Sequence, residues 1–160
     1  MLLLALVACE DTVSTCEDAA TVEPRVELGV GELDFEDVAE GDLVDAVRGP
    51  QGGFHVWGAV RTEGFDPGHD ALLGRYDEGP EVRFEFLVDD FVAAEGGAFR
   101  PFEGDVYDAT LVGEPVYVDA WSLWDDWEEP QDVLGLFTVT VEDACGTTGS
   151  AEREVALSIW

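Results

Sequence analysis

The sequence of 160 residues contains no lysine and no asparagine, and its seven basic residues, all arginine, face 37 Asp and Glu. The formal net charge at pH 7 is therefore −30. Nucleic-acid binding draws most of its affinity from Lys and Arg that neutralise phosphates, so this composition excludes nucleic acid as a partner. It also excludes unaided electrostatic adsorption to an anionic lipid surface. A salt-adapted origin stays open as the cause of the acid excess, because salt screens repulsion between like charges.

Residues that commonly carry catalysis are scarce as well. The chain has two histidines, His55 and His69, so it lacks a structural zinc site of Cys and His at the usual spacing. No serine lies in a G-x-S-x-G motif. Paired carboxylates are so frequent in this chain that they carry no specificity. We therefore expect no enzyme. The alternative is a small metal-dependent hydrolase that uses His55 and His69 together with Asp66 or Asp70.

The chain also lacks a long hydrophobic run, although a short one lies at its start. Residues 2–8 are apolar, which is too short for a bilayer span of about 20 residues but suits the core of a signal peptide. The segment Leu6-Val7-Ala8-Cys9 resembles the bacterial lipobox, which implies removal of residues 1–8 and lipidation of Cys9. No basic residue precedes the run, so an upstream start codon is one expectation. A buried first strand with a free thiol is the alternative.

Cysteine is rare, with three in the chain. If Cys9 carries lipid, Cys16 and Cys145 remain as an even pair in an oxidising compartment, and we predict a disulfide between them. The closed loop of about 130 residues would stabilise the fold by roughly 4–5 kcal/mol in the chain-entropy model. Residues 9–24 are polar and aperiodic, which predicts a flexible, lipid-anchored tether before one domain at 25–160.

Apolar residues alternate with polar ones through much of the remaining chain, which is the period of half-buried antiparallel strands. The predicted strands are residues 26–30, 43–48, 54–62, 82–88, 105–112, 116–124, 137–141 and 155–159. Gly and Pro clusters that predict turns separate them, at 49–53, 66–68, 78–80, 95–97 and 146–149. This pattern predicts an all-β fold, an Ig-like antiparallel β-sandwich of about 7–9 strands.

Two segments resemble known families. Residues 137–157 contain FTVTVEDACG, a Gly-flanked turn and EVAL, and they resemble the last hairpin of Ig-like and PKD-like extracellular domains. This resemblance implies a β-sandwich. Residues 49–57, GPQGGFHVW, resemble a segment of acidic, Gly-rich lipoproteins of myxobacteria. That resemblance implies a lipoprotein of the cell envelope and no particular activity.

Aromatic residues supply the candidate binding surface. Alternation along residues 54–62 places His55, Trp57 and Arg61 on the face opposite the core. Three tryptophans lie within residues 121–127, and strand alternation would place Trp121 opposite Trp124, so at least one should be exposed. We expect a binding surface that involves His55, Trp57, Trp124 and Trp127. The alternative is that most of these rings belong to the core.

Acidic loops supply the candidate metal site. Asp89 with Asp90, and Asp125 with Asp126, lie in oxygen-rich segments that suit Ca²⁺, which takes 6–8 oxygen ligands. None of these segments has the EF-hand spacing, and a solvated acidic surface explains the same residues. We therefore expect no cofactor, with Ca²⁺ as the alternative.

These observations predict a lipid-anchored structural or binding module of the bacterial cell envelope, periplasmic or surface-exposed and without catalysis. An envelope protein or a glycan is the expected partner, in addition to the membrane that holds the lipid. A calcium-dependent adhesion domain is the alternative function.

Overall fold

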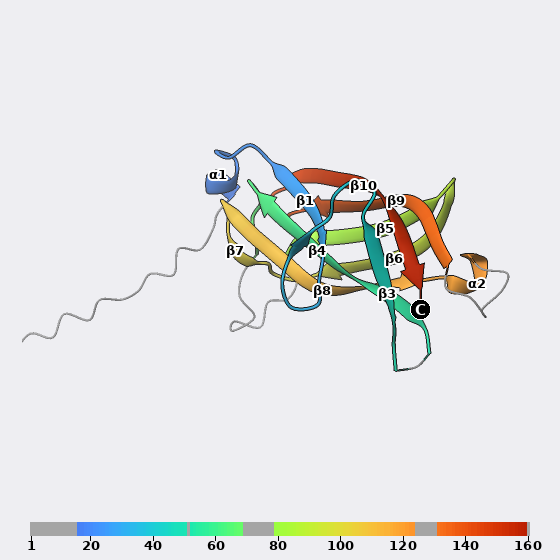
Figure 1. The fold of residues 1–160 in the computed structure, drawn as a ribbon. Coiled ribbons are helices and arrows are strands. Elements are labelled where there is room, and N and C mark those ends of the chain that lie inside the picture. The colour runs from blue at the N-terminus through green and yellow to red at the C-terminus, as the bar shows by residue number, and fades with distance from the viewer. Residues whose placement is uncertain (1–15, 51, 69–78, 124–130, 160) are drawn as a thin grey trace, which may run out of the picture.

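The computed structural model describes residues 16–50, 52–68, 79–123 and 131–159 (Figure 1). Its elements are α1 (Cys16–Ala19), β1 (Arg25–Val30), β2 (Glu36–Asp37), β3 (Leu43–Arg48), β4 (Phe54–Glu63), β5 (Glu81–Val88), β6 (Phe91–Phe99), β7 (Glu103–Asp105), β8 (Asp108–Val118), α2 (Ala120–Leu123), β9 (Gln131–Glu142) and β10 (Thr148–Ile159). Within these described ranges, no helix has the length and apolar character needed to cross a membrane.

Seven of the strands close into a ring. From β4 the hydrogen-bonded neighbours run β3, β10, β9, β5, β6 and β8, and β8 pairs again with β4. All of these pairs are antiparallel except β3–β10, which is parallel. Strand β1 pairs with β4 and carries β2, while β7 extends from β8. Helix α1 lies at one end of the ring, and α2 lies at the other together with the end of β10 (Figure 1).

Two junctions of the ring are short. Strand β3 meets β4 at two residue pairs, and β6 meets β8 at two, whereas β9 and β10 pair over twelve. The prediction of an all-β, largely antiparallel fold is confirmed. Instead of the two separate sheets of the predicted sandwich, the two halves hydrogen-bond at these junctions and form a barrel with extra strands. Alternation in the sequence shows which residues face the core but not which strand edges pair, so it does not separate the two architectures.

The interior of the ring is filled with apolar side chains. The rings of Phe84 and Phe137 meet with centroids 6.1 Å apart, and an apolar cavity of only about 10 Å³ lies between the strands. Such a volume holds about one water molecule. Further buried residues include Leu28, Val56, Val60, Val82, Phe86, Leu111, Val116, Val139, Val155 and Leu157. A search for binding sites among the described residues therefore turns to the outer surface and the ends of the ring.

Three predictions about single segments are wrong. Residues 105–112, predicted as one strand, run from the end of β7 through a two-residue turn into β8. Of residues 116–124, predicted as one strand, 116–118 end β8 and 120–123 form the helical turn α2. Trp121 lies in that turn, so strand alternation does not apply to it. Residues 95–97, predicted as a turn, lie inside β6. Gly96 lets the backbone of β6 approach β8 closely, because a Cβ on Gly96 would lie 2.5 Å from the Pro115 carbonyl oxygen. Gly97 faces the other neighbour, β5, where its Cβ would lie 2.6 Å from the Val82 carbonyl oxygen.

Candidate functional site

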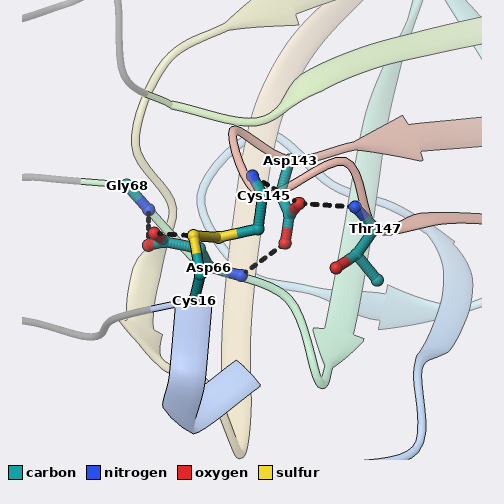
Figure 2. The surroundings of a disulfide bond; sticks show 6 residues. All are labelled: Cys16, Asp66, Gly68, Asp143, Cys145 and Thr147. Carbon is teal, nitrogen blue, oxygen red and sulfur yellow. Dashed lines mark hydrogen bonds between the residues drawn. A yellow bond between two sulfur atoms is a disulfide. The ribbon is translucent and has the colours of Figure 1, made fainter. Parts of the chain in front are cut away.

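The predicted disulfide between Cys16 and Cys145 is present and joins residues 129 positions apart. Cys16 begins α1, and Cys145 lies in the turn between β9 and β10, so the bond attaches α1 to that turn (Figure 2). Ala19 in α1 is buried, so α1 packs against the domain through this residue as well as through the disulfide. Of the predicted tether, residues 9–15 lie outside the described residues, as does Cys9.

Two buried carboxylates organise the surroundings of this disulfide. The Asp143 carboxylate accepts backbone N–H groups of Cys145 at 2.9 Å, Thr147 at 2.8 Å and Asp66 at 2.8 Å. The Asp66 carboxylate accepts the N–H of Gly68 at 3.0 Å through Oδ1. Figure 2 shows the two carboxylates on either side of the Cys145 sulfur. Asp143 thus fixes the β9–β10 turn and connects it to the segment after β4.

An aromatic cluster lies on the outer face of β4 and β8. The rings of His55 and Trp57 have centroids 4.4 Å apart with planes at 82°, and those of His55 and Tyr117 have centroids 6.4 Å apart with planes at 52°. Tyr117 is the register partner of His55 and is 64% exposed, whereas His55 and Trp57 are half-buried. We call these three residues the aromatic face. The structure confirms that His55 and Trp57 share one side of β4.

Arg61 follows on the same side of β4 but is engaged by other residues. Its guanidinium carbon lies 4.3 Å from the centroid of the Phe35 ring, which is a cation–π distance. The guanidinium also lies 3.6 Å from carboxylate oxygens of Glu27 and Asp108. The predicted group of His55, Trp57 and Arg61 is therefore divided. Arg61 contacts Phe35, Glu27 and Asp108 from neighbouring segments of the chain.

One carboxylate borders the aromatic face, and a second lies further along β8. Glu95 of β6 is exposed and is the register partner of Tyr117. Glu114 of β8 has a side chain that is 15% exposed and lies 3.8 Å from Arg100. Burial raises the pKa of the Glu114 carboxyl, and the nearby Arg100 charge opposes this rise. Glu95 is thus the acidic neighbour of the aromatic face that the strand register shows.

The other predicted site residues form no metal site within the described residues. Asp89 and Asp90 form the exposed turn between β5 and β6, and Asp89 has a φ of 53°, a conformation that Asp tolerates better than most residues. Within the described ranges, no group of three potential ligands includes Asp89, Asp90 or His55. The predictions for His69, Asp70, Trp124, Asp125, Asp126 and Trp127 fall outside the described residues.

Sequence reasoning missed two features of these sites. Tyr117 lies in an alternating V-Y-V segment that signals an outward ring, but the alternation does not show that β8 runs beside β4. Asp66 and Asp143 are 77 residues apart. Both are followed by turn-forming residues, which is typical of side chains that bind their own backbone. Their pairing depends on the closure of the ring and has no local signal.

Comparisons with known proteins give little further guidance. No protein-family model matches the chain, and no curated protein matches it. Among solved structures, the chain is similar to the CooA pilin subunit from enterotoxigenic Escherichia coli. The sequence identity is 9%, the TM-score is 0.37, and the match covers 83% of this chain and 97% of the pilin chain. A likeness at this level assigns neither a fold family nor a function.

Proposed function

We propose that the chain is an exported, non-enzymatic binding module of the bacterial cell envelope, anchored by lipid at Cys9. The observation that carries this proposal is the Cys16–Cys145 disulfide, because such bonds persist in oxidising compartments outside the cytosol. The lipobox-like Leu6–Cys9 segment and the resemblance of residues 49–57 to myxobacterial lipoproteins support the anchor. The folded domain would be a closed variant of an Ig-like sandwich.

The aromatic face is the surface that we propose for partner binding. Its rings are set at 82° and 52° to one another, so they do not form the flat platform on which a sugar ring stacks. Angled rings can instead surround a guanidinium or ammonium group. Glu95 beside Tyr117 and the net charge of −30 also attract a cation. These features favour a basic segment of another envelope protein over a glycan.

The anchor is tested by the fractionation of cells that express the full chain. Cys9→Ser is expected to move the protein from the membrane pellet to the soluble fraction, because no thiol remains for lipid. Cys16→Ser removes the disulfide but keeps Cys9, so this variant is expected to stay in the pellet. A Cys9→Ser protein that still sediments with membranes would contradict the anchor.

The binding surface is tested with an oligoarginine peptide and fluorescence anisotropy at 0.15 M NaCl. Tyr117→Ala is expected to weaken binding about tenfold, which is a typical loss for an aromatic residue central to an interface. Tyr107→Ala is the matched control, since Tyr107 is also 64% exposed and lies away from the aromatic face between β7 and β8. Its affinity should not change.

Two results would contradict the choice of surface or partner. Equal affinities for Tyr117→Ala and Tyr107→Ala would show that the peptide responds only to the general negative charge. The second result concerns purified peptidoglycan. If the protein co-sediments with it, and Tyr117→Ala abolishes this co-sedimentation but leaves the affinity for the peptide unchanged, the partner is a glycan instead.

A further inference from the structure

A carboxylate oxygen of the buried residue Asp66 faces the disulfide, and among the described residues no hydrogen-bond donor reaches it. Asp66 is 9% exposed, and its Oδ1 accepts the Gly68 N–H. Its Oδ2 lies 3.7 Å from Cys145 Sγ, but a disulfide sulfur carries no hydrogen and therefore donates nothing. Among the described residues no N–H or O–H group donates to Oδ2. Buried carboxylate oxygens usually have a partner, so this oxygen requires an explanation.

The Asp66 carboxylate and the Cys145 sulfur have the spacing of two metal ligands, and the Cys16 sulfur lies beside them. One ligand atom each of Cys16, Cys145 and Asp66 lies within 4.8 Å of the others. Zinc binds thiolate sulfur at about 2.3 Å and carboxylate oxygen at about 2.1 Å, so two such ligands of a tetrahedral site lie roughly 3.6 Å apart. The observed distance of 3.7 Å between Asp66 Oδ2 and Cys145 Sγ matches that edge.

We propose that Cys16, Cys145 and Asp66 bind a thiophilic divalent cation such as Zn²⁺ when the disulfide is reduced. Two molecules of a low-molecular-weight thiol would supply the electrons, becoming a disulfide while the protein gains two thiols. Zn²⁺ then displaces the two thiol protons to solvent and takes Asp66 Oδ2 as its third ligand. Water occupies the fourth position. The site exists only in the reduced chain, because in the oxidised chain the two sulfurs are bonded to each other.

Two of the three ligands stay oriented when the sulfur–sulfur bond is broken. Asp143 accepts the backbone N–H of Cys145 through Oδ1 and that of Asp66 through Oδ2, and neither bond involves sulfur. The reduced site therefore needs only Cys16 to move by the small distance that separates two sulfurs in non-bonded contact. The cation would replace the disulfide as the connection between α1 and the β9–β10 turn.

The ligand set also selects the cation. Two thiolates favour Zn²⁺ or Cd²⁺ over the hard cations Ca²⁺ and Mg²⁺, which prefer oxygen ligands. Stoichiometric binding at this site is therefore distinct from loose attraction of cations to an acidic surface. It should persist in the presence of a large excess of Ca²⁺.

The experiment uses the full chain with Cys9→Ser, so that Cys16 and Cys145 are the remaining thiols. The protein is reduced with a phosphine, which is then removed, and Cd²⁺ is titrated in the presence of excess Ca²⁺. One equivalent of Cd²⁺ is expected to produce an ultraviolet sulfur-to-cadmium charge-transfer band. Asp66→Asn should weaken Cd²⁺ affinity at least tenfold. Asp45→Asn, which changes an exposed acid on β3, should leave it unchanged, and the oxidised protein should show no band.

Three results would overturn the proposal. The first is a reduced protein that keeps its β-sheet circular dichroism spectrum but shows no band. The second is equal Cd²⁺ affinity in the Asp66→Asn and Asp45→Asn proteins, which would assign binding to the thiols alone. The third result applies if reduction unfolds the chain. One equivalent of Cd²⁺ should then restore the β-sheet spectrum, and a spectrum that is not restored would contradict the proposal.

Discussion

Single residues hold the disulfide end of the barrel in place. The Asp143 carboxylate accepts three backbone N–H groups, two from its own turn and one from Asp66 in the segment after β4. A buried N–H that loses its acceptor costs more free energy than an average hydrogen bond contributes. Removal of the Asp143 side chain is therefore costly mainly because three backbone N–H donors lose their acceptor.

Asp143→Ala is expected to lower the free energy of unfolding by about 3 kcal/mol, because one buried and two part-buried backbone N–H groups lose a charged acceptor. Asp143→Asn keeps one acceptor oxygen and should lose roughly half as much. Urea denaturation followed by circular dichroism measures both. The control Asp45→Ala changes an exposed residue and should shift stability by less than about 0.5 kcal/mol. An Asp143→Ala protein as stable as this control would refute the assignment.

At the scale of strands, the closure of the ring depends on how closely β6 and β8 approach each other. They share two residue pairs, next to the point where Gly96 faces backbone atoms of Pro115 and Val116. Backbone atoms cannot move aside as a flexible side chain does. Glycine is therefore needed at position 96 because the backbone of β8 leaves no room for a side chain, and not because residue 96 has an unusual φ angle.

Gly96→Ala is expected to destabilise the protein by about 2 kcal/mol or more, since the added methyl group would force β6 away from β8. Gly53→Ala serves as the control, because a Cβ on Gly53 meets no atom within 4 Å. Its stability should be unchanged or slightly higher, through the lower entropy of the unfolded chain. Thermal unfolding of the two variants gives the comparison, and equal melting temperatures would show that β6 and β8 have room to separate.

The sequence predicts strands well where alternation is strict. The expected strand at residues 43–48 has the same bounds as β3, and residues 54–62 and 82–88 differ from β4 and β5 by one residue. Strand β6 is missed because its Ala and Gly residues give no alternating pattern. The disulfide follows from cysteine count and compartment, whereas the Asp66–Asp143 contact spans 77 residues and arises only when the ring closes.

At the scale of the whole molecule, the dominant property is the charge. With 37 acids and 7 arginines, carboxylates outnumber basic side chains more than fivefold, and folding brings them closer together. Acidic residues also occupy the two edge strands of the sheet. Strands β2 and β7, with two and three residues, contain Glu36, Asp37, Glu103 and Asp105, all exposed. Short, charged edge strands resist pairing with other chains.

The melting temperature is expected to rise by about 5 °C or more between 0.01 and 1 M NaCl, since the Debye length falls from about 30 Å to about 3 Å and repulsion between carboxylates is screened. Scanning calorimetry measures this. Choline chloride at equal ionic strength should give a similar rise, because screening does not depend on the identity of the cation. A melting temperature that is independent of NaCl would show that self-repulsion is small.

The position of the disulfide has a mechanical consequence. A force applied between the N-terminal side of Cys16 and the end of β10 passes through the sulfur–sulfur bond directly to Cys145, 129 residues further along the chain. Residues 17–144 then lie outside the path of tension, and only the segment after Cys145 can be extended. A domain held at its N-terminal side in a surface under shear would keep most of its strands in place until that bond is reduced.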